Sequence, residues 1–234
     1  MTRYADCSTT GKKENGTAVC EVVMEKICRY GWAALAAAMA GDILVSWILP
    51  LLCDGCSLKM SVSALGSPQS PVRLPFNIWM LAEGLLFIYA LPEVYSRYRE
   101  ISVVPARIMA ACIAVFAVGA CIFTCFFSVN ETKDIVTPAS VIHGIGSALG
   151  FMALLAVPLL VSMLSYKGGE RGISVLGAVS FALALISFVL FVMSDKDSFA
   201  GTVIDNEGIW ERLCLIFMYL PLFAECIHAR GQSV

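Results

Sequence analysis

The sequence predicts an all-α membrane protein with six transmembrane helices, arranged as three hairpins, and with both termini in the cytoplasm. Composition supports this class, because 59% of the 234 residues are hydrophobic and only 15% are charged. The mean hydropathy is +0.80, and a soluble domain rarely combines such values. A formal net charge of -2 offers no basic surface for nucleic acid, and we find no zinc-finger or RNA-binding signature. We therefore expect no nucleic-acid partner.

Apolar runs of the length needed to cross a bilayer, about 20 residues, define the helices. They are expected near Trp32–Cys53, Phe76–Val94, Val104–Phe127, Pro138–Leu164, Ile173–Met193 and Ile209–Ile227. Prolines within or near the ends of these runs, Pro50, Pro92, Pro158 and Pro221, should bend helices whose freed carbonyls are satisfied by neighbours.

The runs divide the chain into three parts. Residues 1–31 are a cytoplasmic or interfacial segment, residues 32–228 the transmembrane domain, and residues 229–234 a short cytoplasmic tail. In the first part, the apolar residues from Val19 to Ile27 either form a short interfacial helix or are disordered.

Lysine and arginine placement predicts the orientation. With the N-terminus inside, eleven of these residues fall on the inner side and five on the outer side. The inner ones are Arg3, Lys12, Lys13, Lys26, Arg29, Arg97, Arg99, Arg107, Lys167, Arg171 and Arg230, and the outer ones Lys59, Arg73, Lys133, Lys196 and Arg212. The positive-inside rule then puts both termini in the cytoplasm, and the second, fourth and sixth helices begin at the outer face.

A proline-punctuated loop leading into the second helix is the first candidate site. The loop includes Ser63 and Gly66, and Pro75 suits the first helical position, where a missing N–H costs no bond. Asn77 then lies in the first turn, and Glu83 lies deeper, within hydrocarbon. An ionisable group there is expensive enough to suggest a function. The alternative is a buried polar pair that fixes helix packing.

Asp42 lies in the middle of the first helix, on a run rich in alanine and glycine. Small residues allow neighbouring helices to approach closely, so Asp42 should face protein. Insertion of a central aspartate costs roughly 2.5–3.5 kcal/mol, so it needs a partner. It either bonds to Ser46 or a neighbouring backbone group, or takes part in a ligand or proton site, with Arg212 as one candidate partner.

The fourth helix places His143, Gly146, Ser147 and Gly150 on one face, because they are three, four and seven residues apart. That face should pack tightly and present one imidazole, which either bonds at a helix interface or binds a ligand. The other histidine, His228, lies at the inner end of the sixth helix, on the opposite side of the membrane from His143. This separation excludes paired haem ligation, and a zinc site lacks ligands. We therefore expect no metal and no other cofactor.

Glu211 and Arg212 open the sixth helix. The helix dipole favours a glutamate there, so a capping role explains Glu211 by itself. Adjacent helical residues point in different directions, so either one can turn inward. An arginine that does so suits a carboxylate or phosphate headgroup, which its planar fork binds bidentately.

Ten cysteines raise the question of redox chemistry. Cys53 and Cys56 have C-x-x-C spacing at the outer end of the first helix, where they form either a disulfide or two free thiols. A thiol oxidoreductase is disfavoured. Cys28 lies near the membrane and could accept a palmitoyl group.

Several short motifs together resemble those of the domain of unknown function 998 family of membrane proteins. They are Ser63, Leu65 and Gly66 in the loop, Pro71 and Phe76-Asn77 after it, Gly84, His143 with Gly146, Gly150-Phe151, and Gly208-Ile209-Trp210-Glu211-Arg212. Many relatives carry an acidic residue after the loop serine, where this chain has Ala64. The resemblance implies six helices in a bacterial or archaeal membrane and no settled activity.

These candidates leave three hypotheses for function. The first is a non-enzymatic membrane protein that binds, senses or moves a lipid or small amphiphile in an outward-opening pocket, with Arg212 or His143 at the headgroup and Glu83 or Asp42 as the interior polar contact. The second is a lipid-modifying enzyme with His143 or Glu83 as base and Ser61 or Ser63 as nucleophile. The third is a structural or assembly role. Membrane lipids and a small amphiphile are the expected partners, and a bacterial plasma membrane the expected location.

Overall fold

The computed structural model describes residues 30–130 and 136–231, and every regular element within them is helical. The elements are α2 (Gly31–Ile48), η1 (Leu49–Leu52), η2 (Val62–Gly66), α3 (Arg73–Arg99), α4 (Val103–Phe116), η3 (Ala117–Ile122), α5 (Phe123–Phe126), α6 (Pro138–Lys167), α7 (Arg171–Ser194), η4 (Asp197–Phe199) and α8 (Glu207–Gly231). The interfacial helix expected between Val19 and Ile27, and Cys28, lie outside the described residues.

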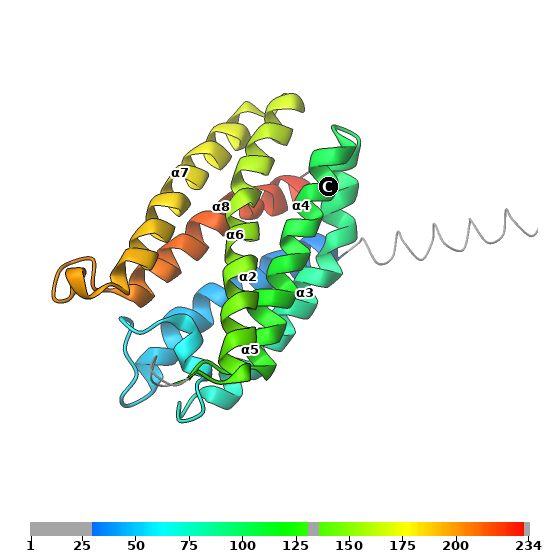
Figure 1. Ribbon diagram of the computed structural model, residues 1–234. Helices are drawn as coiled ribbons and strands as arrows, with labels where there is room; N and C mark the ends of the chain where they lie inside the picture. Colours follow the sequence, from blue (N-terminus) through cyan, green and yellow to red (C-terminus); the bar gives the residue numbers. More distant parts are fainter. Residues whose placement is uncertain (1–29, 131–135, 232–234) are drawn as a thin grey trace, which may run out of the picture.

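Six helices in the described part of the chain are long and apolar enough to cross a membrane, as predicted. Each packs against the next in the chain, and α8 returns to α2, so the bundle closes on itself. Figure 1 shows the turns after α3 and α6 at one end and the loops after α2 and α7 at the other. We call these the turn end and the loop end. The arrangement as three hairpins across a membrane and the orientation stay predictions.

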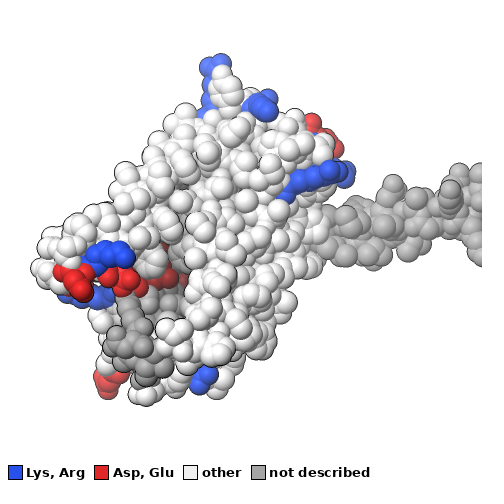
Figure 2. All heavy atoms as spheres, viewed as in Figure 1, with Lys and Arg blue, Asp and Glu red and all other residues white. Residues whose placement is uncertain are grey.

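Charged atoms on the face shown in Figure 2 gather towards the two ends of the bundle, and a belt of uncharged surface lies between them. Large apolar side chains such as Leu44, Leu85, Ile145 and Ile186 are exposed on the helices. Exposed apolar side chains in such number are expected where the surroundings are lipid. Acidic atoms are also visible in a hollow near the loop end (Figure 2).

Glycines on α6 allow it to pack closely against η3 and the end of α4. A Cβ added to Gly146 would lie 2.8 Å from the carbonyl oxygen of Gly119, and one added to Gly150 would lie 2.9 Å from Cβ of Ala120. The tight packing predicted for this face of α6 is therefore present, and it holds His143 against η3 and α5. The helical segment opposite it changes locally to π-helix over Ala117–Ile122, which sequence periodicity did not predict.

The predicted limits of the second and sixth helices were wrong. The second helix ends at Arg99 instead of about Val94. The second transmembrane helix begins at Arg73, so Pro75 is its third residue rather than its first. The missing N–H still costs nothing, because the first four N–H groups of a helix have no partner within it. The last helix ends at Gly231 instead of near Ile227, so it extends into the predicted tail.

A polar network that the sequence did not suggest joins α3, α6, α8 and the turn before α7 at the turn end. Arg97 forms an ion pair with Glu170, and its Nε lies 3.5 Å from Oε2 of Glu225. Ser165 donates a hydrogen bond of 3.2 Å to Oε1 of Glu225, which is fully buried. This network closes the bundle at the end opposite the cavity described next.

Candidate functional site: a cavity at the loop end

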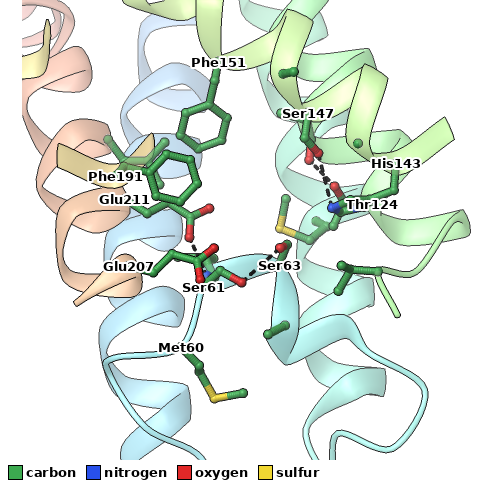
Figure 3. A pocket seen from close by; sticks show the side chains of 18 of the residues that line it. Met60, Ser61, Ser63, Thr124, His143, Ser147, Phe151, Phe191, Glu207 and Glu211 are labelled. Carbon is green, nitrogen blue, oxygen red and sulfur yellow. Dashed lines mark hydrogen bonds between the residues drawn. The ribbon is translucent and has the colours of Figure 1, made fainter. Parts of the chain in front are cut away.

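A cavity of about 560 Å³ opens at the loop end, between η2 and the helices around it. It is lined by seven of the candidate residues that the sequence singled out, namely Asp42, Ser61, Ser63, Glu83, His143, Ser147 and Glu211. Figure 3 shows Ser61, Glu207 and Glu211 on one side of the space and Thr124, His143 and Ser147 on the other. Asn77, Gly66 and Arg212 are not part of the lining.

Glu211 connects α8 to the loop. Its Oε2 accepts a hydrogen bond of 2.6 Å from the backbone N–H of Val62, the first residue of η2. The carboxyl group thus caps η2. From the sequence, the capping role expected for Glu211 was at the start of its own helix, α8. The hydroxyl oxygens of Ser61 and Ser63, on either side of Val62, lie 3.4 Å apart and both line the cavity.

Arg212 is fully buried and binds backbone carbonyl groups of α2, of the loop before η2 and of α8. Its Nε donates to the carbonyl oxygen of Ser46 at 2.8 Å, and Nη1 donates to those of Leu58, Met60 and Gly208 at 3.1, 3.1 and 2.7 Å. The carbonyl of Ser46 would normally accept from the residue four positions later, but that residue is Pro50, which has no N–H. Arg212 therefore satisfies the carbonyl that the proline frees.

Two glycines allow the loop to lie this close. A Cβ on Gly208 would collide with the carbonyl oxygen of Met60, and its own N–H donates to the carbonyl of Lys59 at 2.8 Å. A Cβ on Gly66 would lie 2.8 Å from Oδ1 of Asn77. Gly66 and Asn77 therefore belong to the contact between η2 and the start of α3, outside the cavity.

The histidine side of the cavity is built on α6. Nδ1 of His143 lies 3.0 Å from the carbonyl oxygen of Phe127, and Nε2 lies 3.4 Å from the hydroxyl of Ser147. Thr124, which faces them, donates its hydroxyl proton to the carbonyl of Ala120 at 2.6 Å. The imidazole is thus oriented by a backbone carbonyl on one side and faces hydroxyl groups on the other (Figure 3).

Two carboxyl groups of the cavity lining share a tyrosine on α8. The hydroxyl of Tyr219 on α8 lies 2.9 Å from Oδ2 of Asp42 and 3.3 Å from Oε1 of Glu83. All three side chains are buried. The partner of Asp42 is therefore Tyr219, while the hydroxyl of Ser46 donates to the carbonyl of Ile43 and Arg212 binds carbonyls.

Aromatic side chains supply most of the remaining lining. Phe76, Phe116, Phe151, Phe188 and Phe191 line the cavity, and the rings of Phe151 and Phe191 are stacked with centroids 6.3 Å apart. Phe116 also contacts Tyr219, with centroids 6.3 Å apart. The cavity therefore combines a polar group of carboxyls and hydroxyls with a large apolar surface.

Sequence reasoning missed Tyr219 and the aromatic lining. Tyr219 follows Arg212 by seven residues and so lies on the same face of α8, which is a signal the sequence does contain. The phenylalanines have no such signal, because apolar residues occur all around a transmembrane helix. Among the described residues, no group of three or more His, Cys, Asp or Glu is placed to hold a metal ion.

The sulfur atoms of Cys53 and Cys56 are joined in a disulfide, with Cα atoms 5.6 Å apart. It lies in the loop between η1 and η2, and neither cysteine lines the cavity. Cys121 and Cys214 are buried in the bundle.

Six helices of membrane-spanning length and composition in the described part of the chain define a multi-pass membrane protein. The chain belongs to the family described as proteins of unknown function, DUF998, whose sequence profile matches residues 33–228. This confirms the resemblance drawn from the short motifs. Comparisons with curated proteins and with solved structures found no match.

Proposed function

We propose that this protein, in a bacterial plasma membrane, binds a lipid or small amphiphile in the loop-end cavity in order to sense or move it. The observation that carries the proposal is the union, in one space of about 560 Å³, of buried polar side chains with five phenylalanines. Ligand cavities typically measure about 300–1,000 Å³ and have an apolar lining with a few polar groups that orient the ligand. A molecule with a polar head and an apolar tail matches that division.

The contacts assign the polar head to different residues from those first expected. Arg212 has Nε and Nη1 committed to backbone carbonyls and does not line the cavity. The headgroup contacts therefore fall to His143 and Ser147 on one side and to Glu211 and Ser61 on the other. Glu83 and Asp42 stay the interior polar contacts. The tail lies along Phe151 and its neighbours.

Native mass spectrometry of protein released from a gentle detergent tests this proposal. We expect a discrete bound mass on the wild type that is lost or strongly reduced in Glu83→Gln and in His143→Ala. Glu225→Gln is the matched control, because it alters a buried glutamate that does not line the cavity. All four proteins are first compared by thermal unfolding in the same detergent. Identical spectra without a bound species would refute the proposal and favour a purely structural role.

A lipid-modifying enzyme is the second candidate, and one contact favours it. Ser147 and His143 are paired at 3.4 Å, and the carbonyl of Phe127 orients the other ring nitrogen. The hydroxyls of Ser61 and Ser63 instead contact each other. An enzyme of this kind predicts that Ser147→Ala retains the bound mass but abolishes turnover of an added lipid extract, whereas a binding protein shows no turnover with any variant.

Orientation is tested by labelling single cysteines introduced into a cysteine-free background. Val203 lies at the loop end and Tyr166 at the turn end, and both are exposed. Because the arginines and lysines around Tyr166 favour the cytoplasm, a membrane-impermeant maleimide added to intact cells should label Val203→Cys and leave Tyr166→Cys unlabelled until the cells are lysed. The reverse pattern would place the cavity mouth on the cytoplasmic side.

A further inference from the structure

The charge of the cavity lining suggests what headgroup it takes, if the proposed function holds. Three buried carboxyl groups line the space, those of Asp42, Glu83 and Glu211. Among the described residues, no lysine or arginine lines it. A phosphate or carboxylate headgroup would meet like charge here, so the lining disfavours the anionic headgroup that Arg212 first suggested.

Glu83 has an oxygen available for a ligand. Its side chain is fully buried, and among the described residues no hydrogen bond within 3.5 Å reaches Oε2, although the side chains of Trp79 and Cys121 lie beside this carboxyl group. Native structures rarely leave a buried polar atom unpaired, since the cost is about 1–3 kcal/mol and more for a charged group. An N–H donor that enters the cavity would remove this cost.

Tyr219 lies between the carboxyl groups of Asp42 and Glu83 but cannot donate a hydrogen bond to both. A tyrosine hydroxyl has a single proton to donate, yet Tyr219 lies within hydrogen-bond distance of Asp42 and of Glu83. The second carboxyl group therefore depends on other donors, and the side chains of Trp79 and Cys121 lie beside Glu83. Any donor added from the cavity side has Glu83 within its reach, because Glu83 lines the space.

The nearest buried cation, Arg212, makes its hydrogen bonds to backbone groups, although its charge also attracts Asp42 and Glu211. The guanidinium of Arg212 faces the carbonyls of Ser46, Leu58, Met60 and Gly208. Glu211, beside it in the chain, receives its hydrogen bond from the backbone of Val62 instead. One guanidinium cannot balance the buried carboxyl groups of Asp42, Glu83 and Glu211 together, so protons or a bound cation must compensate the remainder.

We propose that the cavity binds an amphiphile whose headgroup is an ammonium cation. The ammonium donates hydrogen bonds to Oε2 of Glu83 and to the carboxylate of Glu211, and the alkyl chain packs against Phe151 and Phe191. The faces of these rings also attract a cation. The inference rests on the proposed function and adds the charge of the ligand to it.

Three amphiphiles with the same dodecyl chain test the inference: dodecylamine, dodecylglycerol and dodecyl phosphate. Each is titrated into the purified full-length protein, and bound species are counted by native mass spectrometry. We expect one dodecylammonium per protein, bound at least about tenfold more tightly than the other two, and at least about tenfold more weakly by Glu83→Gln. Dodecylglycerol binding should weaken less in that variant, because its headgroup carries no charge and loses only a neutral hydrogen bond.

Glu211→Gln and Glu225→Gln complete the design. Glu211→Gln retains an acceptor oxygen for the N–H of Val62, so we expect it to fold normally. It should also weaken dodecylammonium binding, and it therefore tests the proposal even if Glu83→Gln fails to fold. Glu225→Gln should leave binding unchanged, because Glu225 lies at the turn end. Equal or tighter binding of dodecylglycerol or dodecyl phosphate would overturn the ammonium assignment and leave the amphiphile site standing. Dodecylammonium binding that is equal in all variants would also overturn it. Failure of all three probes to bind would refute both proposals.

Discussion

Replacing Arg212 with methionine should destabilise the protein by about 3 kcal/mol or more, because the carbonyl groups of Ser46, Leu58 and Met60 lose their side-chain donor and a buried carbonyl costs about 1–3 kcal/mol when unpaired. The carbonyl of Gly208 retains a helical donor, the backbone N–H of residue 212. Methionine has similar length and no donor, so packing is largely retained. The thermal unfolding transition in detergent should fall steeply, and little folded protein should accumulate in the membrane. The measurement is the transition temperature together with the yield of monodisperse protein.

Two further variants separate the hydrogen bonds from the charge. Arg212→Lys retains the positive charge but has a single ammonium in place of the fork, so it should restore only part of the stability. Arg73→Met removes an exposed arginine at the same end of the bundle, one whose hydrogen bond to Ser128 measures 3.3 Å, and should change little. A methionine variant at Arg212 as stable as wild type would show that the loop from Cys53 to Ser61 is held by other contacts.

The roles of Glu211 and Arg212 illustrate how far the sequence could predict the site. Their position at the start of an apolar helix showed that one of them could turn inward. It did not show which, because the partners are backbone groups of a loop about 150 residues earlier in the chain. Nothing in residue type marks a carbonyl as unpaired, with one exception. Pro50 frees the carbonyl of Ser46, and a donor from a neighbouring element was expected there.

Asp42 and Glu83 show the complementary case. Their cost within hydrocarbon identified them as buried and in need of partners, and both line the cavity. The partner, Tyr219, could not be chosen from the sequence, because the pairing depends on how α2, α3 and α8 rotate against one another. Those rotations are set by side-chain packing, whereas the number and approximate limits of the helices follow from apolar length alone.

Gly146→Leu is expected to have the second large effect, a loss of about 3 kcal/mol or more. Helices in lipid associate through close packing, because lipid chains are as apolar as the side chains they replace. A Cβ at Gly146 already meets the carbonyl oxygen of Gly119 and the ring of Phe123, each at 2.8 Å. A backbone oxygen cannot move aside as a flexible side chain can. The leucine must therefore push α6 away from η3 and displace His143, which precedes it by three residues.

Gly144→Leu is the matched control for this effect. Gly144 lies on the same helix two residues earlier, and a Cβ added there meets no atom within 4 Å. It should leave the unfolding temperature unchanged or raise it slightly, because leucine favours the helix by roughly 0.5–1 kcal/mol over glycine. Gly146→Ala should fall between wild type and Gly146→Leu. If both leucine variants unfold at the wild-type temperature, then the close contact between α6 and η3 does not hold the bundle together, and His143 must be positioned by its bond to the carbonyl of Phe127 alone.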